Sequence, residues 1–194
     1  MGKPETRERI RRTRRERDDA ALPVAAEALA AHAMALMPSR PSLVACYLSM
    51  PSEPGTAPLI AALRSAGHTV VVPRIDGDDL RWIQLDDDTM YMDGPLGINE
   101  PTGGTEIASL AWVDVVILPA LAVDRSGQRL GKGLGFYDRA LAGVRRHDAK
   151  GPLRIALLFD DEVIDDAHAE AHDAPVDIVI TPSGVLDLRT PGRA

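Results

Sequence analysis

The strongest chemical signal in the sequence is a run of glycines and cations between residues 127 and 139. Gly131, Gly133 and Gly135 stand at every second position, with Arg129 before them and Lys132 among them. Glycine allows positive φ angles and close approach of the backbone to a ligand, and the cations supply charge. A helix that begins after the last glycine would add the free N–H groups of its first turn. The pattern favours an anion site, for phosphate above all, over a merely tight strand-to-helix turn.

Two common phosphate-binding motifs do not fit this segment. A P-loop requires GxxxxGK followed by Ser or Thr, whereas the spacing from Gly127 to Lys132 is one residue short and Gly133 follows the lysine. The dinucleotide-binding fingerprint requires GxGxxG, and the spacing here is GxGxG. The expected site is therefore of neither type.

The residues around the glycines predict a strand, a turn and a helix. The apolar run from Val113 to Leu118 ends at Pro119 and predicts a buried parallel strand. Residues 124–127, Asp-Arg-Ser-Gly, predict a turn. From Phe136 onward we expect a helix with Leu141 and Val144 on its inner face.

A second loop is expected at the same edge of the sheet. Strands at 42–48 and 68–72 flank a helix at 58–66, which is a βαβ unit with parallel strands. Loops 50–56 and 119–135 both leave carboxyl ends of strands, where ligands gather in such sheets. With further strands at 80–85, at 153–159 and, as the last one, at 176–181, the order of elements predicts a three-layer α/β fold with a largely parallel sheet flanked by helices.

Composition places limits on the class of protein. The 194 residues carry a net charge of −7 and one cysteine, Cys46, and contain no apolar run of membrane-spanning length. We expect one domain over residues 1–194, a loose tail at 189–194 and a cytoplasmic location. Residues 1–20 form a basic segment, in which Glu5–Arg9 and Glu8–Arg12 have the spacing of helix-stabilising pairs. A solvated helix docked on an acidic body is favoured over nucleic-acid binding.

Several segments together resemble one enzyme family. Residues 129–139, RLGKGLGFYDR, resemble the RLGxGxGYYDR signature of 5-formyltetrahydrofolate cyclo-ligases, and residues 118–124, LPALAVD, resemble the strand and turn before it. Lys3 and Arg7 match the family's N-terminal Lys-x-x-x-Arg. Residues 47–56, YLSMPSEPGT, residues 94–101, GPLGINEP, and residues 172–177 resemble three further family segments. The resemblance implies a fold similar to the phosphosugar isomerase and CoA-transferase group.

The resemblance also implies a reaction and its residues. It implies conversion of 5-formyltetrahydrofolate to 5,10-methenyltetrahydrofolate, with ATP as co-substrate and Mg²⁺ as cofactor. The implied ATP-binding residues are Lys3, Pro4, Glu5, Thr6, Arg7, Arg129, Leu130, Gly131, Lys132, Gly133, Leu134, Gly135, Phe136 and Tyr137. The implied substrate contacts are Arg7, Met50, Glu53, Gly55 and Tyr137, and the implied metal ligands are Asp138 and Asp173.

One departure from the family pattern bears on function. Gly55 stands where many members of the family carry an acidic residue that contacts the pterin, and Glu53 is a candidate to compensate. His168 and His172 form HxExH, which is not the HExxH of zinc hydrolases. Two alternatives stay open: a nucleotide- or folate-binding homologue without turnover, and a sugar-phosphate isomerase of related fold. The expected partners are small molecules, without nucleic acid or membrane, and the expected state is a monomer or weak homo-oligomer.

Overall fold

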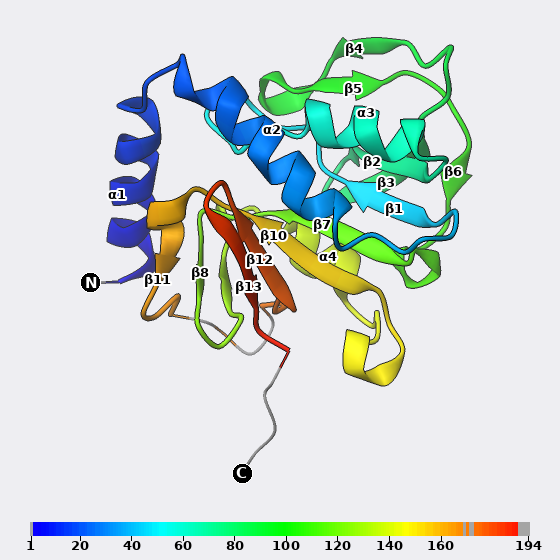
Figure 1. Ribbon diagram of the computed structural model, residues 1–194. Coiled ribbons are helices and arrows are strands. Elements are labelled where there is room, and N and C mark those ends of the chain that lie inside the picture. The colour runs from blue at the N-terminus through cyan, green and yellow to red at the C-terminus, as the bar shows by residue number, and fades with distance from the viewer. Residues whose placement is uncertain (1, 169, 171–172, 190–194) are drawn as a thin grey trace.

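The computed structural model describes residues 2–168, 170 and 173–189, and a large sheet forms its centre (Figure 1). In spatial order its eight strands are β13 (Gly184–Asp187), β12 (Ile178–Thr181), β10 (Leu153–Leu157), β7 (Val115–Pro119), β1 (Leu43–Cys46), β2 (Thr69–Asp76), β3 (Asp79–Gln84) and β6 (Glu106–Ile107). The strands from β12 to β2 run parallel, and β13, β3 and β6 pair antiparallel. The predicted largely parallel sheet is confirmed.

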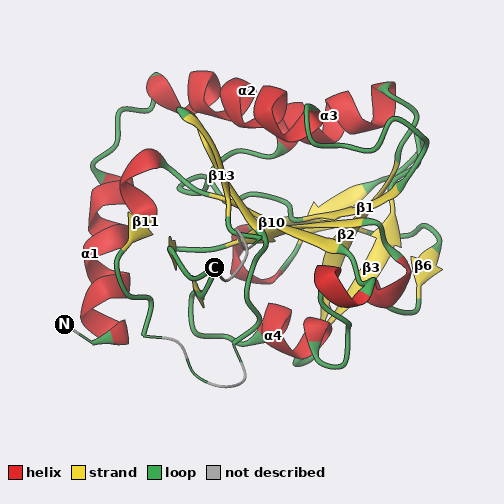
Figure 2. Cartoon of the chain, turned by 60° about the horizontal axis from the view of Figure 1, so that its bottom comes forward, coloured by secondary structure: helices red, strands yellow, loops and turns green. Residues whose placement is uncertain are grey.

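Helices cover both faces of this sheet, as Figure 2 shows. α2 (Ala21–Met34) and α3 (Ala57–Ser65) lie on one face, where Leu29 and Leu59 are buried in a core that includes residues of β1, β2 and β12. α4 (Phe136–Leu141) lies on the other face and buries Leu141. Because β7 is covered on both sides, its sequence is a continuous apolar run instead of an alternating one. The predicted three-layer arrangement is thereby confirmed.

The N-terminal helix lies outside these layers. α1 (Lys3–Arg15) packs beside a small sheet of β11 (Val163–Ile164), β8 (Ala122–Asp124) and β9 (Arg129–Leu130), in that order (Figure 1). Ile10 of α1 is buried against Leu121 and Leu130. The small sheet leads directly into the glycine-rich segment, so α1 contacts the element that the sequence identified as the binding site.

A buried ion pair fastens the end of α1. Arg14 donates from Nε to Glu162 Oε1 at 2.7 Å and from Nη2 to Glu162 Oε2 at 2.8 Å, and also to the carbonyl of Ala120 at 2.7 Å. Both side chains are 2% exposed. Asp161, which precedes Glu162, forms a second ion pair with Arg17 at 2.8 Å, and this pair is partly exposed. A buried bidentate ion pair fixes the geometry of both side chains, whereas an exposed ion pair contributes little to the stability of the fold.

We expect Glu162→Gln to destabilise the fold far more than Asp161→Asn does. The first change leaves the buried Arg14 without a countercharge, at a cost on the order of 3 kcal/mol. The second removes a partly exposed pair worth about 0–1 kcal/mol. Urea unfolding of both variants checks this. Equal, small changes in the free energy of unfolding would contradict the role given to Arg14.

Three sequence predictions need correction. The helix from Phe136 ends at Leu141, because Ala142 has a non-helical ψ of 124° and Gly143 a φ of 76°, so Val144 packs from beyond the helix. The strand at 178–181 is not the last one, since β13 pairs with it as a hairpin. The segment after β7 is not plain loop, since β8 and β9 pair across the confirmed turn at Asp124–Gly127.

The remaining elements are a pair of short strands and four 3₁₀ helices within the described residues. β4 (Tyr91–Asp93) and β5 (Asn99–Pro101) form a two-stranded flap. The 3₁₀ helices are η1 (Pro95–Gly97), η2 (Leu110–Trp112), η3 (His147–Ala149) and η4 (Asp160–Glu162). None of the helices within the described residues has the length and apolar character needed to span a bilayer.

Candidate functional site

A cavity of about 300 Å³ lies where the two predicted loops meet. Met50 and Glu53 line it from the loop after β1, and residues 129–138 line it from the glycine-rich segment. Lys3 and Arg7 reach it from α1. The flap and the C-terminal segment complete the wall. The two loops therefore face one crevice, as expected from strands whose carboxyl ends share one edge.

Backbone conformation explains the glycines of this segment. Gly133 has a φ of 101° and Gly135, at the N-cap of α4, has a φ of 72°. L-residues with side chains rarely adopt such angles. A Cβ atom at Gly135 would also lie 2.7 Å from Nη1 of Arg139. The loop therefore presents bare backbone to the cavity at the start of a helix, which is the arrangement that binds anions.

Arginines of α1 support the loop from behind. Arg7 donates from Nε to the carbonyl of Gly131 at 2.9 Å, and Arg11 donates from Nη2 to the carbonyl of Lys132 at 3.1 Å. A Cβ atom at Gly133 would lie 3.6 Å from the guanidinium carbon of Arg7. α1 thus holds the glycine-rich loop in place and adds a cation to the same wall.

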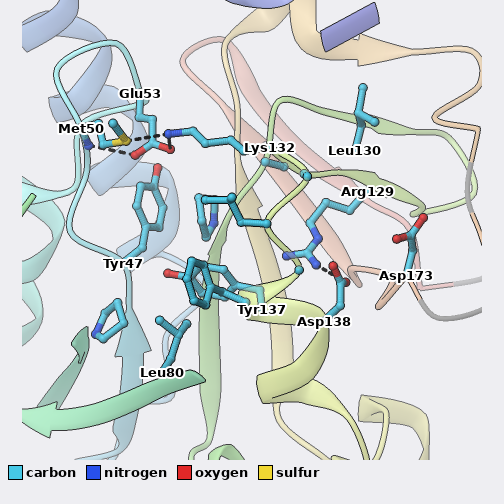
Figure 3. A pocket seen from close by; sticks show the side chains of 18 of the residues that line it. Tyr47, Met50, Glu53, Leu80, Arg129, Leu130, Lys132, Tyr137, Asp138 and Asp173 are labelled. Atoms are coloured by element: carbon cyan, nitrogen blue, oxygen red, sulfur yellow. Dashed lines mark hydrogen bonds and ion pairs between the residues drawn. The ribbon is translucent and has the colours of Figure 1, made fainter. Parts of the chain in front are cut away.

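Lys132 links this loop to the other one. Its ammonium lies 2.7 Å from Glu53 Oε1 and also contacts the sulfur of Met50, as Figure 3 shows. The second oxygen of Glu53 accepts a hydrogen bond from the Met50 backbone at 2.8 Å. Both oxygens of this buried carboxylate are therefore engaged within the protein.

Two more ion pairs place carboxylates on the cavity wall. Arg129 donates to Asp138 at 2.5 Å, as Figure 3 shows. The same oxygen of Asp138 accepts a hydrogen bond from the Ala174 backbone at 3.0 Å. Lys3 lies 2.8 Å from Asp173 and 2.7 Å from Glu170. Burial opposes the charged form of Lys3, but hydrogen bonds and charge from these two acids raise its pKa above the ordinary value. The predicted phosphate contact Lys3 and the predicted metal ligand Asp173 thus bond to each other.

The donor set fits a magnesium ion that is shared with phosphates. Asp138 and Asp173 both line the cavity beside cations suited to phosphate. Mg²⁺ is usually held by one or two carboxylates together with substrate phosphates and waters. Within the described residues, no group of three or more His, Cys, Asp or Glu side chains is placed to hold a metal unaided. The residues therefore suit a metal that arrives with a nucleotide better than a permanently held one.

The rest of the wall is largely apolar. Tyr137 packs edge-on against Trp82, with ring centroids 6.1 Å apart. Burial raises the pKa of Tyr137 well above its ordinary value, so the phenol stays neutral at physiological pH. The apolar part of the lining includes Pro73, Ile75, Leu80, Ile98 and Phe136. The cavity thus joins a cationic, glycine-rich part to an apolar part.

Most of the predicted site residues line this cavity. Those that do are Lys3, Arg7, Met50, Glu53, Asp173 and every residue from Arg129 to Asp138. Pro4, Glu5 and Thr6 do not, although they occupy the first turn of α1. Gly55 does not either, and a Cβ atom there would lie 2.9 Å from the Cβ of Ala26. The binding roles of these residues stay predictions, and His172 lies outside the described residues.

The sequence prediction missed part of the lining. The lining residues that had no assigned role include Tyr47, Glu100, Glu170, Pro73, Ile75, Leu80 and Ile98. Glu100 had a visible signal, because it belongs to the Glu-Pro end of the GPLGINEP segment. The apolar residues had none, since a hydrophobic residue of a binding wall has the same local pattern as one of the core.

Comparisons with known proteins agree with this arrangement. The model of the 5-formyltetrahydrofolate cyclo-ligase family matches residues 1–182. The 5-formyltetrahydrofolate cyclo-ligase of Mycolicibacterium smegmatis is 38% identical over 154 residues, covering 75% of this chain and 77% of that protein. The protein of the same name from Escherichia coli is 32% identical over 148 residues, covering 74% and 80%. The solved structure of Aquifex aeolicus 5,10-methenyltetrahydrofolate synthetase has a TM-score of 0.84 at 26% identity and covers all of this chain and 96% of that one. The chain belongs to the 5-formyltetrahydrofolate cyclo-ligase family.

Proposed function

We propose that this protein converts 5-formyltetrahydrofolate to 5,10-methenyltetrahydrofolate while ATP becomes ADP and phosphate. The observation that supports this most is the composition of the cavity. One part carries a positive-φ glycine loop with Lys3, Arg7 and Lys132 around it, which suits a nucleotide's phosphates. The other part is apolar and suits a flat ring. Membership of the family makes ATP and a reduced folate the ligands of choice.

The chemistry requires activation of a poor electrophile. The formyl oxygen attacks the γ-phosphorus, the bond from that phosphorus to the β-phosphate oxygen breaks, and ADP leaves. N10 of the folate then attacks the activated formyl carbon and gives up its proton, and the carbon–oxygen bond breaks to release phosphate. Phosphoryl transfer depends mainly on positioning and on neutralising charge. A lining rich in glycine, arginine and lysine meets that need without a protein nucleophile.

The residues of the wall take separate roles in this proposal. The bare backbone from Gly131 to Gly135 and the cations around it bind and orient the phosphates. Asp138 and Asp173 are the side chains that would hold Mg²⁺, which when bound neutralises phosphate charge. Tyr137, as a neutral phenol beside the glycine loop, positions the substrate where the two parts of the cavity meet.

One assay tests the proposal against a homologue without turnover. The protein is mixed with 5-formyltetrahydrofolate and Mg·ATP, and the absorbance of the methenyl product is followed. We expect product to form only when both substrates are present, with one ADP released per product. Tight nucleotide binding without product would instead identify a regulator that has lost catalysis.

We expect Lys3→Ala and Arg7→Ala each to raise the KM for ATP. Losing one charge-assisted contact to phosphate costs on the order of 1.5–3 kcal/mol, which is about a tenfold to hundredfold change. Arg15→Ala is the matched control on the same helix, because Arg15 is exposed and pairs with Glu8. Steady-state kinetics measure all three variants. If both site variants have the same KM for ATP as the control, α1 only holds the glycine-rich loop and does not bind ATP.

A further inference from the structure

One carboxylate of the cavity differs from the others in its partners. Five acidic side chains among the described residues line the cavity: Glu53, Glu100, Asp138, Glu170 and Asp173. Four of them pair with a cation of the same wall: Glu53 with Lys132, Asp138 with Arg129, and the other two with Lys3. No Lys, Arg or His of the described part of the chain forms an ion pair with Glu100.

Glu100 is nevertheless buried, with 6% of its surface exposed. Its Oε1 accepts a hydrogen bond from the backbone of Ile75 at 3.1 Å. Its Oε2 has no hydrogen bond within the described residues, and protein atoms do not enclose it. A buried carboxylate is costly unless N–H donors or cations satisfy it. A ligand that donates a hydrogen bond to Oε2 would therefore satisfy this acceptor on the cavity wall.

The flap is shaped around this side chain. Glu100 belongs to β5, and a Cβ atom at Gly94 would lie 2.5 Å from Glu100 Cγ and 2.6 Å from Cδ. The absence of a side chain at Gly94 therefore leaves the room in which the carboxylate lies. Ile75 and Ile98, which line the cavity with it, are apolar. Phosphate does not suit this place, since it would add negative charge beside an unpaired carboxylate.

We propose that Glu100 recognises the pterin ring of the folate through the ring's adjacent N3–H and 2-amino groups, an inference that rests on the proposed function. These two N–H donors point in parallel, like the fork of a guanidinium group, and a carboxylate accepts such a pair. Oε1 retains a second lone pair beside the Ile75 bond, and Oε2 is free. Glu100 thereby fixes which edge of the ring enters the apolar part of the cavity.

The two positions of the loop after β1 that the family resemblance offers for this contact, 53 and 55, are less suitable. Glu53 has one oxygen on Lys132 and the other on the Met50 backbone. Position 55 carries glycine, lies off the cavity, and has no room for a side chain beside Ala26 of α2. Among the acids of the loop after β1 and of the flap that line the cavity, Glu100 thus has the available acceptor.

The test measures binding separately for each ligand, so that no turnover occurs. The full chain and the variant Glu100→Gln are titrated with 5-formyltetrahydrofolate alone, with ATP alone, and with the 2-desamino-2-methyl analogue of the folate. Glutamine keeps an acceptor for Ile75 but places an NH₂ group against the ring's donors. Glu106→Gln is the matched control, because that exposed carboxylate pairs with Arg81 outside the cavity.

We expect Glu100→Gln to weaken folate binding about tenfold to a hundredfold and to leave ATP binding unchanged. Wild type should bind the analogue more weakly than the folate by a similar factor. The variant should bind the analogue as tightly as wild type does, because the substitution and the missing 2-amino group remove the same interaction. Glu106→Gln should bind all three ligands as wild type does.

Three outcomes would overturn the inference. Equal folate affinity in wild type and Glu100→Gln would do so while leaving the proposed function intact. Equal weakening of ATP and folate, with a lower melting temperature, would assign Glu100 to holding the flap. Absence of folate binding by wild type would overturn the proposed function as well. If the variant does not fold, the titration of wild type with the analogue is the deciding measurement. Equal affinity of wild type for the analogue and for the folate would then reject the pterin contact.

Discussion

Gly135→Val is expected to abolish turnover, lowering kcat/KM by at least about a hundredfold, which corresponds to about 2.7 kcal/mol. Gly135 caps α4 at a φ of 72°, where a β-branched residue is strained. Its new Cβ would also meet Arg139 at 2.7 Å. The flexible end of Arg139 can move aside, but relief of the backbone strain moves the loop away from the path proposed for the phosphates. The product assay and ATP titration measure the effect.

Gly143 provides a control that distinguishes the effect of backbone strain from damage to the binding site. Gly143 follows α4 with a φ of 76°, is exposed, and has no atom within 4 Å of the place a Cβ would take. Gly143→Val therefore imposes similar backbone strain outside the cavity. We expect it to lower the melting temperature about as much as Gly135→Val and to keep turnover. An active Gly135→Val enzyme would remove the role given to the glycine loop.

The sequence predicted the central sheet and the two loops because both have local signals. β7 is a continuous apolar run, β10 is apolar except for Arg154, and the glycine segment carries its own charges and turn residues. The polarity of the strands then places residues 50 and 132 at one edge of the sheet, although the sequence does not show that their side chains are in contact. The confirmed parts of the fold are those that periodicity or chain connection determines.

The parts that were missed depend on long-range contacts or on very short elements. β9 and β11 contain two residues each and show no period. The bond from Arg7 to Gly131 joins residues 124 positions apart, and that from Arg14 to Glu162 joins residues 148 apart. Gly55 looks like a lost pterin contact in sequence, but the neighbouring Ala26 excludes a side chain there. Such facts depend on packing, which a single sequence does not show.

The partners of Asp138 make its predicted metal role testable. Its Oδ1 accepts from Arg129 and from the Ala174 backbone, so the carboxylate is already oriented before any ligand binds. Two hypotheses follow. Asp138 holds Mg²⁺ with its remaining lone pairs, or it serves to position the guanidinium of Arg129 toward the phosphates. Both predict a slow Asp138→Asn enzyme, so the rate alone does not separate them.

The magnesium dependence does separate them. If Asp138 is a ligand, Asp138→Asn should raise the Mg²⁺ concentration for half-maximal rate about tenfold or more and lower kcat about as much, since even partners of metal ligands typically contribute ten- to a hundredfold in affinity. Arg129→Lys is the comparison: it should raise the KM for ATP and leave the Mg²⁺ dependence near wild type, because it keeps Asp138 and removes only the planar fork. Titrations with Mg²⁺ at saturating ATP and folate measure both variants. If Asp138→Asn keeps the wild-type Mg²⁺ dependence while Arg129→Lys matches its loss of rate, Asp138 acts through Arg129, and the metal is held from elsewhere on the wall.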